Sequence, residues 1–142
     1  MKTFILKPKQ AQRKWYLFNA ENKVLGRFAT KVAQTLLGKT RTDYTPNVDS
    51  GDYVIIINSD KIKADEKKKS FKVYYHHSFH PGGLKRTLLG DQMKKDSTQV
   101  IYRAVWGMLP KSKLGRKVIK KLFVYKDQQH PHQAQKPEPI QW

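Results

Sequence analysis

The stretch YVIIIN, residues 53–58, is the part of the sequence on which the fold depends most. It is an unbroken apolar run in which Val54 is followed by three isoleucines. Neighbouring side chains of a strand point to opposite faces, so a strand formed here places apolar groups on both faces. Strands of that kind lie inside the sheets of α/β proteins. The run therefore predicts a central strand that is covered on both sides.

Upstream of this run, the apolar residues change to the spacing of an α-helix. They form one stripe along a helix that Gly38 can end as its C-cap. The aromatic segment WYLFNA, residues 15–20, precedes this helix and is typical of a short buried strand. Strand, helix and strand in this order predict an α/β fold. The stripe consists of Leu25, Phe28, Ala29, Val32, Ala33 and Leu36.

Downstream of the run, further candidate elements follow. FKVYY, residues 71–75, is a strand candidate, and DEKKKS, residues 65–70, is predicted to be a solvated turn. A second helix is predicted from Asp96, a typical N-cap residue, to the Gly and Pro signals at 107–110. A third, short helix over residues 113–121 then leads into a last strand, LFVY.

Length and composition predict a single domain. With 142 residues, of which 38% are hydrophobic, the chain can bury most of its apolar surface in one core. Residues 1–14 are predicted to be an N-terminal extension, residues 15–127 the globular core and residues 128–142 an extended tail. The tail contains three prolines and little apolar surface, so we expect a partner to order it.

The charge of the chain indicates the class of its partner. The formal net charge is +18, from 29 Lys and Arg against 11 Asp and Glu. Eight basic residues and no acidic residue lie between Ser97 and Lys126, so the charge belongs to the folded body rather than to a tail. A compact body this basic repels itself unless a polyanion neutralises it. Nucleic acid and an anionic membrane are the two candidate partners.

The sequence weakens the membrane alternative. The longest clean apolar run, residues 54–57, is far shorter than the roughly 20 residues that a membrane-spanning helix needs. The first residues, MKTFIL, are too short for the apolar part of a signal peptide. No membrane partner is therefore expected, and the expected location is the cytoplasm. The chain has no cysteine, which excludes disulfides and thiolate metal sites.

The segment 113–121 carries the sharpest functional signal. Its five basic residues fall on one face of the predicted helix, and Leu114 and Val118 fall on the other. Like charges at this spacing weaken an isolated helix, so the pattern favours contact with phosphates. A merely solvated face is the alternative, although such faces usually mix both signs. The basic residues are Lys113, Arg116, Lys117, Lys120 and Lys121.

The histidines form two groups, one in YYHHSFHPGG (residues 74–83) and one in HPH (residues 130–132). Zinc is not predicted, because His76 and His77 are adjacent on a strand and point to opposite faces, although His76 and His80 could converge after a turn. No Ser, Cys or carboxylate accompanies them in a catalytic pattern. We therefore expect no metal, no cofactor and no catalytic residue here.

Contact with nucleic acid is the interpretation that the histidine stretch favours. Rings of His and Tyr stack on unpaired bases, and the Gly82–Gly83 pair lets backbone approach a partner closely. Lys85 and Arg86 follow directly. The alternative is that part of the stretch is simply core, because a strand in a sheet must bury one face.

Two further motifs resemble catalytic ones. GKT, residues 38–40, resembles the end of a phosphate-binding P-loop, but it follows a helix, whereas a P-loop precedes one. Asp49 and Asp52 could act as an acid and base pair or contact Mg²⁺, but Asp, Ser and Gly before a strand favour a tight turn. Neither motif predicts an enzyme.

Long segments of the chain resemble bacterial large ribosomal subunit protein thirteen. The matching stretches, in order, are WYLFNAENKVLGRFATKVAQTLLGK, YTPNVDSGDYVIIINSDKI, KVYYHHSFHPGG, VWGMLPKSKLGRK, KLFVY and HPHQAQKP. The resemblance implies a three-layer α/β/α domain with a central, mostly parallel or mixed sheet of about four strands. It also implies binding to large-subunit rRNA, a role early in subunit assembly, neighbouring ribosomal proteins, and neither enzymatic activity nor a small-molecule substrate.

Two positions depart from the family pattern. Ala64, Asp65 and Glu66 stand where the family usually has a Thr-Gly turn, and Trp106 replaces a small basic residue. The alternatives to a ribosomal role are a nucleic-acid-processing enzyme and a free-standing DNA-compacting protein. The residues expected to bind RNA are Arg27, Lys31, Lys39, Arg41, His76, His77, His80, Gly82, Gly83, Lys85, Arg86, Lys111, Lys113, Arg116, Lys117, Lys120, Lys121, His130 and His132.

Overall fold

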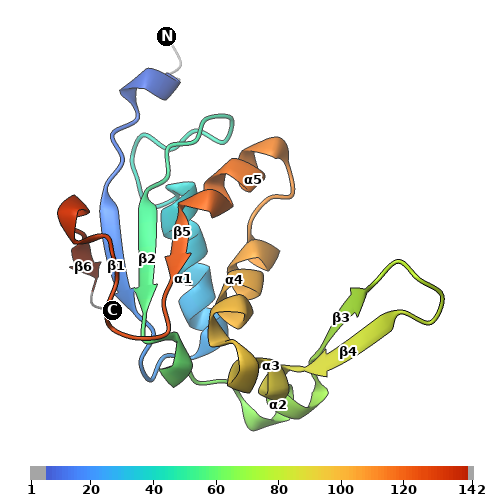
Figure 1. Cartoon of the computed structure of the whole chain (residues 1–142). Helices are drawn as coiled ribbons and strands as arrows, with labels where there is room; N and C mark the ends of the chain where they lie inside the picture. The colour runs from blue at the N-terminus through green and yellow to red at the C-terminus, as the bar shows by residue number, and fades with distance from the viewer. Residues whose placement is uncertain (1–5, 141–142) are drawn as a thin grey trace.

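A parallel four-stranded sheet forms the centre of the computed structural model, which describes residues 6–140 except for the side chain of Lys9. The strand order is β5 (Leu122–Val124), β2 (Tyr53–Ile57), β1 (Trp15–Asn19) and β6 (Glu138–Ile140) (Figure 1). Every neighbouring pair is parallel. The predicted α/β class, the parallel sheet of about four strands and the central place of the 53–58 run are confirmed.

Two helices cover one face of this sheet. Helix α1 (Leu25–Leu37) connects β1 to β2 and packs along α4 (Ser97–Met108). The six residues of the predicted stripe are all buried, and Gly38 ends α1 with the left-handed φ of 77° that favours glycine. The Asp96 carboxylate caps α4 by accepting from the backbone N–H of Thr98. Local spacing and capping therefore predicted both helices correctly.

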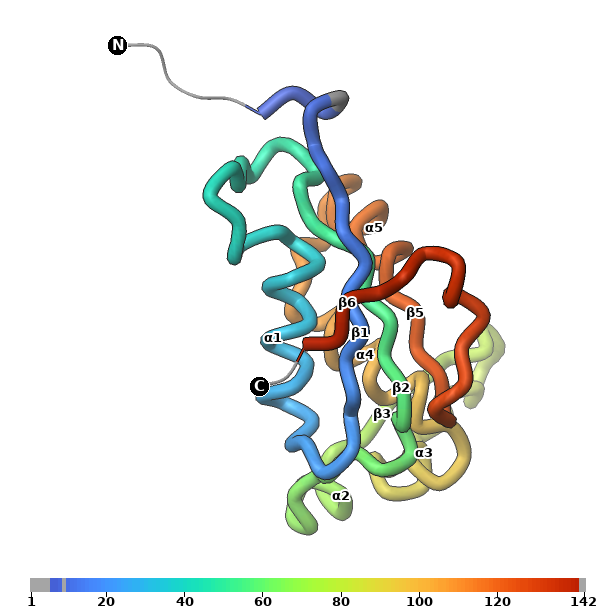
Figure 2. Tube along the Cα trace, turned by 90° about the vertical axis from the view of Figure 1, so that its left-hand side faces the viewer, coloured from blue at the N-terminus to red at the C-terminus, as the bar shows by residue number. Residues whose placement is uncertain are grey.

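The opposite face of the sheet is covered by the C-terminal segment rather than by a third layer of α-helix. Residues 125–137 cross this face on their way from β5 to β6, with one 3-10 turn, η4 (Gln133–Gln135) (Figure 2). The ring of Trp15 stacks on Tyr53 at 4.3 Å and on Phe123 at 5.8 Å, and His132 lies 4.5 Å from Phe123. On this face, the stacked aromatic rings therefore provide the apolar packing that a covering helix would otherwise supply.

Strand β6 shows that the tail is partly ordered by the chain itself. The sequence predicts a tail that only a partner orders, whereas Tyr16, Leu17 and Phe18 pair in parallel with Glu138–Ile140. The order comes from backbone hydrogen bonds, so it needs no apolar periodicity. Pro139 is compatible with an edge strand, because an edge leaves half of the backbone groups unpaired.

A hairpin projects from the domain between β2 and α4. Its strands β3 (Val73–His77) and β4 (Leu84–Leu88) form an antiparallel pair outside the main sheet (Figure 1). Short helices lie at its foot: α2 (Glu66–Phe71) occupies the predicted solvated turn, and α3 (Leu89–Lys95) follows β4. The strand predicted from residue 71 begins at Val73, because Phe71 still belongs to α2.

The remaining elements lead into the last central strand. Helix α5 (Lys113–Val118) continues as the 3-10 turn η3 (Ile119–Lys121) into β5. Two more 3-10 turns are η1 (Pro8–Gln10) and η2 (Ser59–Lys61). None of the helices within residues 6–140 has the length and apolar character needed to cross a bilayer.

Candidate nucleic-acid interface

Helix α5 presents a basic face to solvent. The Ser112 hydroxyl caps it by accepting from the backbone N–H of Gly115 at 3.3 Å. Gly115 is required for space, because a Cβ there would lie 1.8 Å from the Pro110 carbonyl oxygen. Val118 is buried and Leu114 is half-buried, so these two anchor the inner face. Four exposed basic side chains, three on α5 and one on the turn η3 that continues it, form what we call the α5 cationic face: Lys113, Arg116, Lys117 and Lys120.

Lys121 does not belong to this face, so the prediction that all five basic residues point outward is wrong for it. Its side chain is buried, and its ammonium donates to the Asp49 carboxylate and, at 2.8 Å, to the Gly51 carbonyl. Burial lowers the pKa of Lys121, while Asp49 opposes that shift. The residue therefore ties the start of β5 to the loop before β2 and is unavailable to a phosphate.

Asp49 and Asp52 hold distant segments together instead of forming a tight local turn. Asp52 accepts from the Lys14 backbone N–H at 2.9 Å and from the Arg41 guanidinium at 3.1 Å. Arg41 also pairs with Asp43 at 2.8 Å, which raises the pKa of the guanidinium. Arg41 is thus half-buried and neutralised by two carboxylates, a poor position for the predicted RNA contact.

Gly51, between these aspartates, is needed for close approach. A Cβ at this position would lie 1.7 Å from the carbonyl oxygen of Leu36 near the end of α1. Its φ lies outside the left-handed region, so the expected turn conformation is wrong and lack of space is the reason for glycine.

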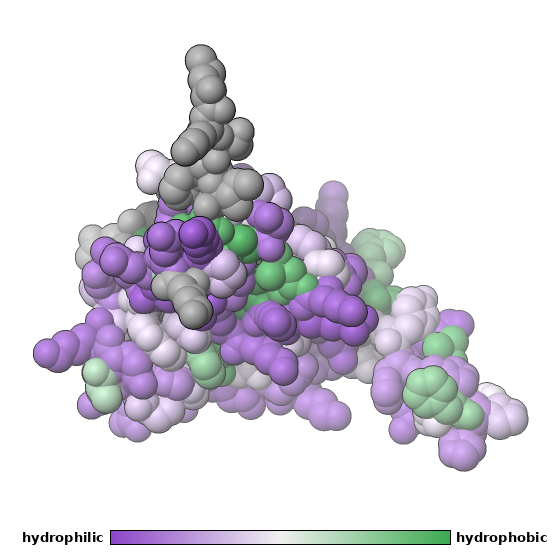
Figure 3. Space-filling view, turned by 90° about the horizontal axis from the view of Figure 1, so that it is seen from above, coloured by the Kyte–Doolittle hydropathy of each residue, from purple (hydrophilic) through white to green (hydrophobic). Residues whose placement is uncertain are grey.

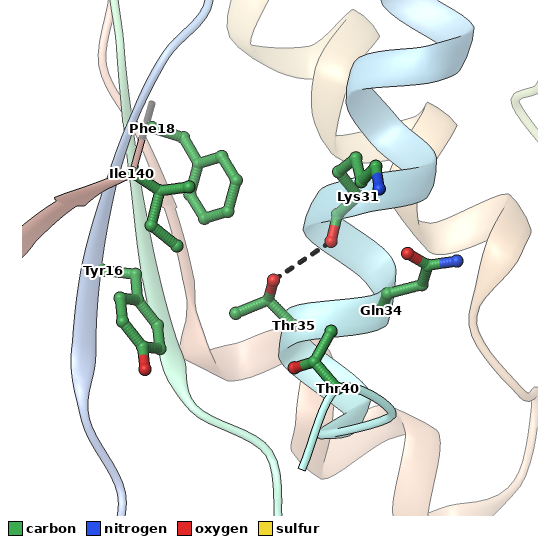
Figure 4. A pocket seen from close by; sticks show the side chains of 7 residues that line it. All are labelled: Tyr16, Phe18, Lys31, Gln34, Thr35, Thr40 and Ile140. Atoms are coloured by element: carbon green, nitrogen blue, oxygen red, sulfur yellow. Dashed lines mark hydrogen bonds between the residues drawn. The ribbon is translucent and has the colours of Figure 1, made fainter. Parts of the chain in front are cut away.

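Helix α1 adds exposed cations beside a cavity. Arg27 and Lys31 on α1, and Lys39 just after its C-cap, are exposed, as a phosphate contact requires. A cavity of about 300 Å³ lies between α1 and the β1–β6 edge, with Lys31 on the helix side and Tyr16 and Ile140 on the sheet side (Figure 4). Apart from Lys31, the lining side chains are uncharged: Tyr16, Phe18, Gln34, Thr35, Thr40 and Ile140. The lining offers no pair of groups for acid and base catalysis.

The projecting hairpin carries the first histidine group. His76, His77 and His80 are exposed, together with Lys85 and Arg86 on the facing strand. Figure 3 shows this projection at the right of the molecule, with hydrophobic side chains set among hydrophilic ones. The loop depends on its glycines, because Gly82 has a φ of 70° and a Cβ on Gly83 would lie 2.1 Å from the Ser78 hydroxyl.

Replacing His76 and His77 by Ala should weaken binding to an RNA fragment roughly tenfold and barely change the melting temperature. Both side chains are exposed, and exposed substitutions usually change the free energy of unfolding by less than about 0.5 kcal/mol. Loss of one base–ring contact costs about 1–3 kcal/mol of binding. Tyr74→Ala is the control, because Tyr74 packs against the core and should lower the melting temperature. Unchanged affinity with a destabilised fold would instead indicate a structural role for the histidines.

The second histidine group packs against the sheet instead of pointing outward. His132 is half-buried, and its Nε2 lies 2.8 Å from the hydroxyl of Tyr125. His130 is also half-buried, with its ring 6.4 Å from that of His132. Their predicted contact with RNA stays a prediction, and the structure gives them a packing role.

The two departures from the family pattern are both accommodated locally. Asp65 is the N-cap of α2, so the altered turn begins a helix. Trp106 packs against the core, and the ammonium of Lys111 lies 4.1 Å from the centre of its ring. Lys111 also donates to the Trp106 carbonyl, so this predicted RNA contact is partly engaged within the chain.

Sequence reasoning missed a cationic group at the foot of the hairpin. The Lys72 ammonium and the Arg103 guanidinium lie 5.4 Å and 5.0 Å from the centre of the Tyr74 ring. Burial raises the pKa of the Tyr74 hydroxyl. The period of two along the strand places Lys72 and Tyr74 on one face, but Arg103 comes from α4 and only the tertiary fold brings it here.

Metal-binding constellations are also absent from the part of the chain that the structure describes. No group of three or more His, Cys, Asp or Glu side chains within residues 6–140 is arranged to hold an ion. Carboxylates are mostly engaged by basic side chains, as for Asp49 and Asp52. The surface is therefore suited to binding a polyanion through cations and rings.

Comparison with known proteins gives a consistent result. A family model described as Ribosomal protein L13 matches residues 13–131. Large ribosomal subunit protein uL13 of Thermotoga maritima is 51% identical over 140 residues, which cover 99% of this chain and 94% of the relative. The proteins of the same name from Wigglesworthia glossinidia brevipalpis and Geobacillus thermodenitrificans are each 52% identical, over 99% and 96% of this chain and over 99% and 94% of the relatives.

Proposed function

Since the chain belongs to the ribosomal protein L13 family, we propose that it is a structural constituent of the large ribosomal subunit and binds large-subunit rRNA. The family model covers most of the chain, and relatives named as large ribosomal subunit proteins match nearly all of it. The net charge of +18 suits a protein whose partner is a polyanion.

The α5 cationic face is the single observation that carries the mechanism. Its four basic side chains are exposed on one surface, and residues 97–126 contain no acidic residue to neutralise them. Each phosphate that a Lys or Arg neutralises releases condensed counterions, which drives association at low salt. The face therefore binds the rRNA backbone and positions the domain, and base contacts add to this.

We further propose where the chain acts and what it does there. The chain acts in the cytoplasm as part of the ribosome, beside other large-subunit proteins, and supports early assembly of the subunit without catalysing a reaction. Support comes from ion pairs such as Arg41–Asp52 and Lys121–Asp49, which tie segments far apart in the sequence together beneath the basic surface. The cavity between α1 and the β1–β6 edge has no reactive pair among its lining residues.

Co-sedimentation tests the proposed function. A tagged chain expressed in bacteria should travel with large subunits in a sucrose gradient and move to the top after ribonuclease treatment. Deoxyribonuclease should leave its position unchanged. A chain found only at the top, or one released by deoxyribonuclease alone, would contradict the ribosomal role and favour a DNA-compacting protein.

A further inference from the structure

Phe79 at the tip of the hairpin is the most exposed large apolar side chain of the described chain, with 93% of its surface accessible. Its φ of 65° lies in the left-handed region, which costs a residue with a Cβ roughly 1–2 kcal/mol. Placing an apolar ring in water and in a disfavoured backbone conformation contributes nothing to folding. The tip is therefore arranged for something outside the chain.

The loop holds Phe79 in this position by several hydrogen bonds. The backbone N–H of Phe79 donates to Nδ1 of His77 at 2.9 Å, and the two rings meet edge to face at 6.0 Å. The loop is closed by bonds from the Ser78 N–H to the Gly83 carbonyl at 3.1 Å and from the Gly83 N–H to the His80 carbonyl at 2.9 Å. The ring is thus presented in advance of binding, which reduces the entropy lost on contact.

The surroundings of the tip indicate the chemistry of its partner. Residues 67–90 contain no acidic residue, while Lys85 and Arg86 lie on β4 and the Arg86 guanidinium sits 5.8 Å from the centre of the Tyr75 ring. An apolar pocket in a protein would take Phe79 without any need for this charge. Cations along the strands and a ring at the end match RNA, which offers phosphates beside the flat faces of bases.

We infer that Phe79 stacks on an unpaired base of the large-subunit rRNA, with His77 as the residue that positions it. This inference rests on the proposed function and adds to it the kind of RNA structure that the hairpin contacts. Base-paired A-form RNA has a deep, narrow major groove that side chains cannot enter, so the target is a loop, bulge or unstacked end. Stacking tolerates any base, because every base has a flat face.

Binding of the full chain to protein-free large-subunit rRNA, made by transcription in vitro, tests this inference. Phe79→Ala should lower the affinity about fivefold to 150-fold, the range of one base–aromatic stack. The slope of log affinity against log salt should stay unchanged, because no phosphate contact is lost. Phe71→Ala is the matched control: its ring is 81% exposed but lies at the foot of the hairpin, and the affinity should stay at the parental value.

A fluorescent variant adds a direct signature of stacking. Phe79→Trp should bind with near-parental affinity, and its added indole emission, measured as the difference from the parent, should be quenched by RNA. Phe71→Trp should show no such quenching.

The outcomes separate this inference from the proposed function. A parent that binds the RNA, with Phe79→Ala binding equally well, would overturn the inference and leave the function standing. Equal binding to RNA combined with failure of Phe79→Ala to enter subunit particles would overturn it too, because the partner of the tip would then be a protein. Failure of the parent chain to bind the RNA would contradict both the inference and the proposed function.

Discussion

With Lys113, Arg116, Lys117 and Lys120 all replaced by Ala, binding to large-subunit rRNA should become much less dependent on salt. Each phosphate contact contributes about 0.9 to the slope of log affinity against log salt on a duplex, so four lost contacts reduce it by about 3.6. A fourfold rise in salt should then weaken the parent about 150-fold more than the variant. Titrations at several salt concentrations measure this directly.

The fold of this variant should remain intact, which makes the result specific to binding. The four side chains are exposed, and Ala is the best helix former, so thermal melts of variant and parent should nearly coincide. Lys94 and Lys95, exposed in the last turn of α3, supply a control. Lys94→Ala with Lys95→Ala removes the same charge as Lys113→Ala with Lys117→Ala but should alter the slope less. Equal slopes for the two pairs would mean that α5 contributes only net charge.

The inner face of α5 should respond in the opposite way, and Val118→Asp should remove most of the stability of the domain. Val118 is 1% exposed, and a carboxylate there is buried without a partner. The cost of several kcal/mol is a large part of the about 5–15 kcal/mol that usually separates folded and unfolded states. Thermal or urea unfolding followed by circular dichroism measures the loss.

The pH dependence of stability identifies the introduced carboxylate charge as the cause of the stability lost in Val118→Asp. Burial raises the pKa of the new carboxyl above the value of about 3.9 in the unfolded chain, so the folded state binds more protons. Lowering the pH towards 4 should therefore restore stability relative to the parent. Leu114→Asp should cost less, because Leu114 is half-buried and its carboxylate can reach water. A melting temperature of Val118→Asp within a few degrees of the parent would contradict the buried packing of α5.

The central elements could be predicted because their information is local. The stripe of α1 with Gly38, the Asp96 cap of α4 and the apolar run of β2 each follow from residues a few positions apart. Strand β6 could not be predicted this way, because its three residues have no apolar pattern and are ordered by the edge of β1. Strand β4 has four exposed residues and only Thr87 half-buried, so its sequence shows no buried face that would mark it as part of a sheet.

In the candidate interface too, local sequence patterns predicted some features, whereas contacts between distant residues could not be predicted. Exposure of Lys113, Arg116 and Lys117 follows from the helical period, but the chain tightens after Val118 into the 3-10 turn η3, which contains Lys120 and Lys121. In a 3-10 turn, residues three apart are eclipsed, so Lys121 lies in line with the buried Val118 instead of with Lys117. Lys121 then meets Asp49, a pairing between residues far apart in sequence that no local pattern reveals.

The position of β1 has a consequence for how the domain forms during translation. A growing chain emerges from its N-terminus, so β1 is made well before Glu138–Ile140, and one edge of β1 stays open until that segment appears. An unpaired edge is a template for pairing with other chains. The ring of His132, in the segment just before β6, also packs 5.4 Å from the ring of Trp15. Until residues 132–140 are made, a nascent chain therefore carries an open sheet edge and an incompletely covered Trp15 ring, and early capture by RNA or a chaperone would protect it from aggregation.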